Sequence, residues 1–156
     1  MIIRVPDLSE ELRRLDYTEK ASSLNEMLAA SKRSDEQRFD EDLRIRAEIH
    51  RYGTDVHLDG RIDGSVRCTC RRCLDDFEWS LRREFRFLII KAQSGDEPED
   101  DTGLDHYRGD EFDLGPLVRE QALLALDRSA LCSEACKGLC PRCGANRNRE
   151  VCSCSD

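Results

Sequence analysis

The stretch LRIRAEIHRYGTDVHLDGRIDGSVRC, residues 43–68, decides the fold, because its apolar residues recur at every second position. This period predicts strands that bury one face and expose the other. The first strand alternates mainly charged residues with four expected core positions, Leu43, Ile45, Ala47 and Ile49. RYGTD, residues 51–55, predicts a turn, after which Val56 and Leu58 form a second strand. The alternation then predicts a third strand, with one face formed by Ile62, Gly64, Val66 and Cys68.

A fourth strand follows the sequence CRRC, residues 70–73. Between residues 77 and 89 the apolar side chains fall on odd positions, with Arg83 as the interruption, which is typical of one long bent strand. Its apolar face is expected to hold Phe77, Trp79, Leu81, Phe85, Phe87 and Ile89. We therefore expect four antiparallel strands in residues 41–90.

The flanking segments complete a single domain of the α+β class. Residues 91–111 predict a solvated loop, because SGDEPEDDTGLDHYRGDE, residues 94–111, is rich in acidic residues and buries little apolar surface. Residues 112–131 predict a C-terminal helix from about Pro116 to Leu126 that lies on the antiparallel sheet. In the N-terminal segment, residues 1–40, MIIRV predicts a strand, whereas EELRRL (10–15) and SSLNEMLAA (22–30) predict short helices.

Composition narrows the class of protein. Of the 156 residues, 38% are hydrophobic and 37% are charged, which fits one domain with a small core. No stretch approaches the roughly 18 apolar residues of a membrane span, and the first residues lack the pattern of a secretory signal. We therefore expect a cytoplasmic protein without membrane association, in a reducing compartment where nine cysteines favour metal binding over disulfides.

Eight of the nine cysteines form four closely spaced pairs, which are Cys70 and Cys73, Cys132 and Cys136, Cys140 and Cys143, and Cys152 and Cys154. Zinc binds four thiolates in a tetrahedron, and a two-residue gap lets a tight turn direct two sulfurs at one ion. CPRCG, residues 140–144, is the strongest signal, because Gly144 can adopt the positive φ that turns backbone N–H groups toward the sulfurs. The four pairs predict two zinc ions, with most ligands in a cysteine-rich tail, residues 132–156.

Four pairs can be sorted into two sites in three ways. The last four cysteines lie within fifteen residues, so they can close one compact site with little loop entropy. Cys132 and Cys136 would then meet Cys70 and Cys73 at the end of the hairpin and hold the helix to the sheet. Cys68 is left over, and its parity with Val66 predicts a buried thiol that packs as a small apolar side chain.

The cysteine spacings also allow other interpretations. Cys136, Cys140 and Cys143 have the C-x3-C-x2-C spacing of an iron–sulfur cluster, but the chain is too short for the barrel of the radical enzymes that use it. A redox-active Cys70–Cys73 pair would need a βαβ setting, whereas here it separates two strands. A redox-switched chaperone that releases zinc on oxidation uses similar pairs and stays open as an alternative.

Signals of catalysis are weak. The sequence contains no phosphate-binding G-x-x-x-x-G-K-[ST], no H-E-x-x-H and no G-x-S-x-G. His50, His57 and His106 are scattered, and surface positions are expected for them. Closed all-cysteine zinc sites leave no coordination position for a substrate. We therefore expect no enzyme and no small-molecule substrate.

The sequence CRRCL, residues 70–74, followed by FDLGPLVREQALLALDRSALCSEACKGLCPRCGANRNREVCSC, residues 112–154, resembles the YceD family of large ribosomal RNA subunit accumulation proteins. The resemblance extends from about Leu43 onward and implies a role in the accumulation of large-subunit ribosomal RNA and in assembly of that subunit. Members whose tails lack the CPxCG portion keep metal-type residues at the positions of Cys70, Cys73, Cys132 and Cys136, which favours the sorting above. This chain departs from the family pattern at Cys68, which is extra, and at Asp127, where a proline is common.

Charge bears on the expected partner, either large-subunit ribosomal RNA or a large-subunit ribosomal protein. The net charge is −8, and each zinc tetrathiolate would add about −2. Basic residues nevertheless gather near the cysteines in the sequence, and the predicted RNA contacts are Arg61, Arg67, Arg71, Arg72, Lys137, Arg142, Arg147 and Arg149. Some of them would simply offset thiolate charge. In the rival interpretation, the acidic loop shields a basic ribosomal protein.

Overall fold

The fold was analysed in a computed structural model that describes residues 1–31, 36–92, 105–127 and 129–154. Its main sheet has the strand order β2-β4-β5-β6-β7, with β3 paired to β5. The bounds are β2 Arg13–Glu19, β3 Gln37–Arg38, β4 Leu43–Tyr52, β5 Asp55–Thr69, β6 Asp76–Lys91 and β7 Asp105–Tyr107. Neighbouring strands are antiparallel except for β6 and β7, which are parallel. A separate two-stranded ladder joins β1 (Ile2–Arg4) to β8 (Glu111–Asp113).

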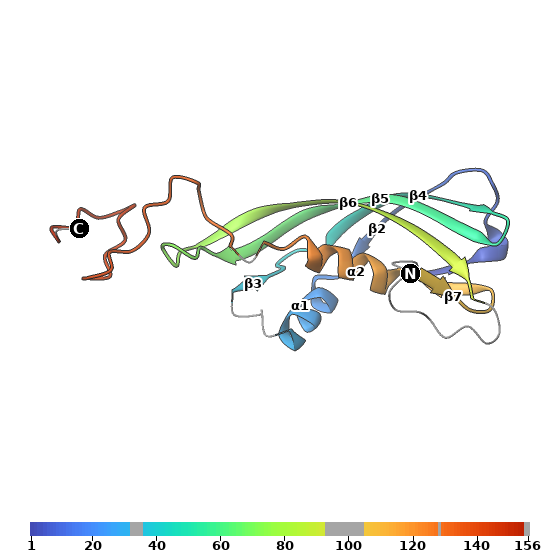
Figure 1. The fold of residues 1–156 in the computed structure, drawn as a ribbon, viewed down its shortest axis with the longest axis horizontal. Coiled ribbons are helices and arrows are strands. Elements are labelled where there is room, and N and C mark those ends of the chain that lie inside the picture. The colour runs from blue at the N-terminus through green and yellow to red at the C-terminus, as the bar shows by residue number, and fades with distance from the viewer. Residues whose placement is uncertain (32–35, 93–104, 128, 155–156) are drawn as a thin grey trace.

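The helices lie on one face of the curved sheet (Figure 1). They are α1 (Ala21–Ala30) and α2 (Leu114–Leu124), with a short 3-10 turn, η1 (Val5–Asp7), after β1. The carboxylate of Asp113 caps α2 by accepting a hydrogen bond from the backbone N–H of Gly115 at 3.0 Å. The expected α+β class, with its antiparallel sheet and C-terminal helix, is confirmed, although α2 occupies only part of residues 112–131.

The hydrophobic core lies between the sheet and these helices. Leu24 and Leu28 of α1, together with Leu114, Val118 and Ala122 of α2, belong to one buried cluster with the inward side chains of β4 and β5, Leu43, Ile45, Ala47, Ile49, Val56, Leu58, Ile62, Val66 and Cys68. Burial of one such Leu or Ile side chain contributes about 1.5–3 kcal/mol. The alternating apolar side chains of residues 43–68 therefore form the sheet face that the helices cover.

β5 is one strand of 15 residues, so the expectation of separate second and third strands is wrong. Val56, Leu58, Ile62 and Val66 keep the same parity, and pairing with β6 runs without a break from Val56 to Thr69. The glycines in DGRIDG do not form a turn, because a Cβ at Gly60 would overlap the ring of Phe85, and one at Gly64 would overlap Leu43. Because these glycines have no side chain, the side chains of Phe85 and Leu43 can pack directly against β5.

The N-terminal segment and residues 91–111 also differ from expectation. MIIRV contains the expected strand, and SSLNEMLAA lies in the expected helix, but EELRRL overlaps strand β2 at Arg13–Leu15. β2 forms because Leu15, the half-buried Tyr17 and Glu19 face inward at alternate positions and the strand pairs along β4. The expected acidic loop falls mostly outside the described residues, but residues 105–107 form β7 and residue 111 begins β8.

The β5–β6 hairpin projects beyond the helices, and the cysteine-rich tail lies at its far end (Figure 1). Thr69 pairs with Asp76 at the tip of this hairpin, so the CRRC turn lies between them. Within the described part of the chain, no helix is long and apolar enough to cross a membrane.

Candidate metal centres

The first cysteine tetrad joins the hairpin tip to the segment after α2. The sulfur atoms of Cys70, Cys73, Cys132 and Cys136 all lie within 4.8 Å of one another. The Sγ atoms of Cys70 and Cys136 are 3.8 Å apart, and those of Cys73 and Cys132 are 3.7 Å apart. A tetrahedral ion with metal–sulfur bonds of about 2.3 Å requires sulfur separations of about 3.8 Å. The four thiols could therefore hold one metal ion without rearrangement.

The turn between Cys70 and Leu74 aims backbone N–H groups at sulfur. Leu74 has a φ of 59°, and its N–H donates to the carbonyl of Cys70 at 2.9 Å. Burial alone would raise the pKa of Cys70, but backbone N–H donors from Cys132, Cys73 and Arg72 lower it to about 6. The turn thus favours the thiolate form of Cys70 in particular, and Leu74 adopts the left-handed conformation that usually favours glycine.

The second tetrad repeats this turn with a glycine. Gly144 has a φ of 75°, as the sequence predicts, and its N–H donates to the carbonyl of Cys140 at 2.9 Å. Backbone N–H groups of Cys143 and Arg142 lower the pKa of Cys140 to about 6. The Sγ atoms of Cys143 and Cys152 are 3.5 Å apart, and all four sulfurs, with Cys154, lie within 4.8 Å of one another.

The cysteines group into the two tetrads that their spacing along the sequence predicts. Cys140, Cys143, Cys152 and Cys154 group together, and Cys70 and Cys73 meet Cys132 and Cys136. Cys68 lies outside both tetrads, in the hydrophobic core, and burial raises its pKa. This confirms the prediction of a buried, apolar thiol. The two tetrads differ in exposure, since three of the first four cysteines are buried, compared with one of the second four.

The backbone and guanidinium of Arg72 connect the two tetrads. The N–H of Leu139 donates to the Arg72 carbonyl at 2.9 Å, and the guanidinium donates to the carbonyls of Glu134 and Cys136 at 3.3 and 3.1 Å. Gly138 has a φ of 71°, and a Cβ there would lie 2.9 Å from the Arg72 carbonyl oxygen. The chain between the tetrads therefore packs closely against the hairpin tip.

Two asparagines of the second tetrad's loop reach the region of the hairpin tip, and one of them contacts the first tetrad. Asn146 donates to the Asp75 carboxylate at 2.8 Å, and Asn148 donates to Sγ of Cys136 at 3.4 Å. The side-chain oxygen of Asn148 accepts the N–H of Lys137 at 2.8 Å. Sequence reasoning missed both residues, and its only signal was their position in ANRNRE, between the ligands of the second site.

The eight basic residues predicted to bind RNA do not form one group. Arg61 lies nine residues before Cys70 on the continuous strand β5, roughly 30 Å away at about 3.3 Å per residue, so its expected place beside the first knuckle is wrong. Arg67 pairs with Asp40 at 2.6 Å, and Arg149 pairs with Asp75 at 3.1 Å. The others near the tetrads are exposed: Arg71, Arg72, Lys137, Arg142 and Arg147.

The predicted surface histidines are not all isolated. His50 and His57 face each other across β4 and β5, with ring centroids 5.0 Å apart, and both are half-buried. His106 lies exposed in β7. None of the three belongs to a cluster of potential metal ligands within the described residues.

Comparison with known proteins agrees with this arrangement. The family model "Large ribosomal RNA subunit accumulation protein YceD" matches residues 58–156, which include both tetrads. The chain is 24% identical over 139 residues to "Large ribosomal RNA subunit accumulation protein YCED homolog 1, chloroplastic" of Arabidopsis thaliana, a match that covers 72% of this chain and 43% of the relative. The Zea mays protein of the same name is also 24% identical over 139 residues, with 70% of this chain and 47% of the relative covered.

The chain thus spans less than half the length of these two relatives. No solved structure matches it significantly. The family match covers well over half of the chain, from β5 to its last residue. The chain therefore belongs to the YceD family of large ribosomal RNA subunit accumulation proteins.

Proposed function

We propose that this protein is a non-catalytic factor that supports accumulation of large-subunit ribosomal RNA by binding that RNA at two zinc-held knuckles. The family description and the names of the two plant relatives support the role in RNA accumulation. A cytoplasmic location is part of the proposal.

The observation that carries the RNA contact is a set of basic side chains around the tetrads. Arg71, Lys137 and Arg142 are exposed, and none of them forms an ion pair within the described residues. By contrast, Arg149 is paired with Asp75 and Arg72 is bonded to backbone carbonyls. Cations without a protein partner can approach RNA phosphates without first breaking an ion pair.

Zinc is the metal that we propose for both tetrads. Four cysteine sulfurs at about the edge length of a metal–sulfur tetrahedron suit one zinc ion per tetrad. A cluster of several irons would separate the cysteine sulfurs further, because sulfide and iron ions would lie between them. An ion with four thiolate ligands has no open position, so it would hold the knuckles in shape and take no part in a reaction.

A binding titration at several salt concentrations tests the proposal. The variant Arg71→Gln/Lys137→Gln/Arg142→Gln should bind a large-subunit RNA transcript more weakly, and the slope of log affinity against log salt should fall by about 2–3. The control Arg4→Gln/Arg13→Gln/Lys20→Gln removes the same charge away from the tetrads and should change the slope little. Equal effects in the two variants, with zinc content and folding preserved, would overturn the knuckle contact.

A second candidate function is a redox-switched zinc chaperone. Cys143 is exposed and Cys152 and Cys154 are half-buried, so oxidants can reach the second tetrad. This function requires that metal release and binding of unfolded proteins occur together. The rival role as a shield for a basic ribosomal protein depends mainly on acidic residues that lie outside the described part of the chain.

A further inference from the structure

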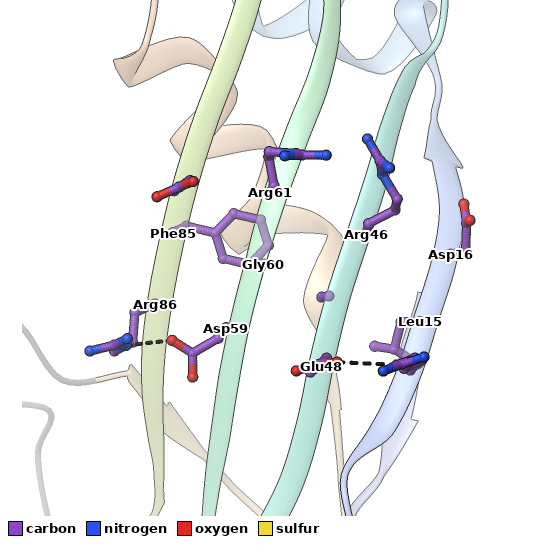
Figure 2. Close-up of a pocket in the computed structure, with 12 residues that line it drawn as sticks. Leu15, Asp16, Arg46, Glu48, Asp59, Gly60, Arg61, Phe85 and Arg86 are labelled. Atoms are coloured by element: carbon purple, nitrogen blue, oxygen red, sulfur yellow. Dashed lines mark hydrogen bonds and ion pairs between the residues drawn. The ribbon is translucent and has the colours of Figure 1, made fainter.

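The sheet face opposite the helices carries a groove that crosses four strands (Figure 2). The groove has a volume of about 800 Å³. Its floor is the sheet itself along one row of paired residues, Leu15, Ala47, Gly60 and Phe85, of which Leu15, Ala47 and Phe85 belong to the hydrophobic core on the other face. The charged side chains of the two adjacent rows form its walls. No helix covers this face among the described residues, so the groove is open to a partner.

Beside one wall of the groove, the row of residues around Asp63 contains an excess of arginine. Arg61 and Arg82 approach the carboxylate of Asp63 at 2.9 and 3.5 Å, and Arg46 bonds to the same carboxylate. Burial alone would raise the pKa of Asp63, but hydrogen bonds from Arg46 and Arg61 hold it below its usual value. Asp63 is therefore charged at neutral pH, and it neutralises one of three arginines.

The strand register also places like charges together on this side of the groove. Arg46 of β4 lies directly opposite Arg61 of β5, an arrangement that is unfavourable in an isolated sheet. Glu84 is the cross-strand neighbour of Arg61 on the other side, and Asp16 is that of Arg46. Because Asp16 bonds to Arg44, the arginines Arg46, Arg61 and Arg82 face two carboxylates, Asp63 and Glu84. This local surplus of one positive charge occurs in a chain whose net charge is −8.

Three other arginines of this face are each paired with one carboxylate. Arg14 bonds to Glu48 at 3.1 Å, Arg44 bonds to Asp16 at 2.8 Å, and Arg86 bonds to Asp59. The ion pairs of Arg86 and Glu48, marked by dashed lines, lie on the opposite side of the groove from Arg46 and Arg61 (Figure 2). The charged residues that line the groove balance, four arginines against four carboxylates, and the spare positive charge comes from the adjoining row, where Arg44 and Arg82 lie on either side of Asp63.

The unused N–H donors of these arginines indicate which kind of ligand they can bind. Each guanidinium offers five N–H donors, whereas one carboxylate accepts about four hydrogen bonds, so most donors on Arg46, Arg61 and Arg82 are not used by Asp63. A phosphate between these arginines would accept several of those donors and would reduce the repulsion between Arg46 and Arg61. A phosphodiester backbone meets this requirement and can also follow an open sheet face.

We propose that this arginine cluster, defined as Arg46, Arg61 and Arg82, is a second contact surface for the RNA backbone, separate from the knuckles. The inference rests on the proposed RNA-binding function. Asp63 lies seven residues before Cys70 along β5, about 23 Å at roughly 3.3 Å per residue, so one RNA can reach both surfaces.

The test compares two double variants on the same sheet face. Arg61→Gln/Arg82→Gln removes unneutralised donors, and the slope of log affinity against log salt for a large-subunit RNA transcript should fall by about 1.5. The control Arg14→Gln/Arg86→Gln removes the same charge from one-to-one pairs and should lower the slope by less than half as much. Equal changes in the two double variants would overturn the inference.

A third variant separates RNA contact from a purely structural ion network. Asp63→Asn frees the arginine cluster, so RNA binding should tighten even though thermal stability falls. A structural network alone predicts lower stability with unchanged RNA affinity, a result that also contradicts the inference. If the wild-type chain shows no salt-dependent RNA binding, the proposed function fails as well. If it binds and responds only to the knuckle variant, only this inference fails.

Discussion

Asn148, in the loop of the second cysteine tetrad, donates a hydrogen bond to Sγ of Cys136 in the first tetrad at 3.4 Å. The same amide accepts the backbone N–H of Lys137, so its orientation is fixed from both ends. A hydrogen bond to a metal-bound thiolate stabilises its negative charge and orients it. The loop that the second site closes therefore supplies a hydrogen bond to a cysteine of the first site.

Replacing Asn148 should weaken metal binding at a tetrad to which it does not belong. Loss of an outer partner of a metal ligand typically costs 10- to 100-fold in affinity, so Asn148→Ala should lower the zinc affinity of the first site by about tenfold or more. Competition with a chromogenic chelator measures the change. The control Glu150→Gln alters the same loop at a side chain with no ion pair in the described chain. Equal affinities in wild type and Asn148→Ala would contradict the coupling.

Removing two ligands of the second site should leave one ion in place. Cys140→Ser/Cys143→Ser is expected to reduce the zinc content from two ions to one per chain, since Cys70 and its three partners remain. The hydrophobic core lies elsewhere, so the thermal midpoint should change little. The remaining ion should bind as weakly as in Asn148→Ala, because the loop is no longer closed. Elemental analysis of the purified protein that finds no zinc, or finds iron, would show that the assignment is wrong.

Burial predicts the order in which the sites lose metal. The second tetrad has one buried cysteine and the first has three, so peroxide or chelator should remove the second ion before the first. Electrospray mass spectrometry of the folded protein during mild oxidation resolves the species with two, one and no ions. Loss of the first ion before the second would contradict the role of burial. Metal release that coincides with suppression of client aggregation would support the redox chaperone instead.

Gly60 should resist even a small side chain. Gly60→Ala places a methyl group against the ring of Phe85 and the side chain of Ala47, and overpacking of this kind costs about 1–3 kcal/mol of unfolding free energy. Chemical denaturation measures the loss, and Ser65→Ala on the same strand is the control. Phe85→Leu should recover part of the loss in the Gly60→Ala background. A Gly60→Ala protein as stable as wild type would mean that the ring does not occupy this space.

The alternation of apolar and charged residues predicted strands correctly where one face of the sheet is buried. Ile45 and Ile49 alternate with charged residues because one sheet face is covered, and this pattern indicated β4 correctly. The short separations among the last four cysteines also indicated the right grouping. The length of β5 was not predicted, because the segment after Leu58 was interpreted as a new strand, whereas Gly60 and Gly64 serve close packing within one strand. Arg61 was misplaced because nearness in the sequence was taken as nearness in space, whereas the extended strand β5 carries it away from Cys70.

Contacts between distant segments could not be predicted from local patterns. The hydrogen bond from Asn148 to Cys136 depends on how the second tetrad's loop folds back onto the hairpin tip. The left-handed conformation of Leu74 was also hidden, because a leucine gives no signal for positive φ. The arginine cluster around Asp63 arises from the register of three strands, β4, β5 and β6, which alternation alone does not fix.

Crosslinking of the protein to RNA in cells, followed by sequencing of the bound RNA, tests the central claim most directly. The account predicts that large-subunit ribosomal RNA is enriched over other abundant RNAs, and that Arg71→Gln/Lys137→Gln/Arg142→Gln loses most of this signal at equal protein level and zinc content. Absence of large-subunit RNA from the crosslinked fraction, or an unchanged signal in that variant, would contradict it.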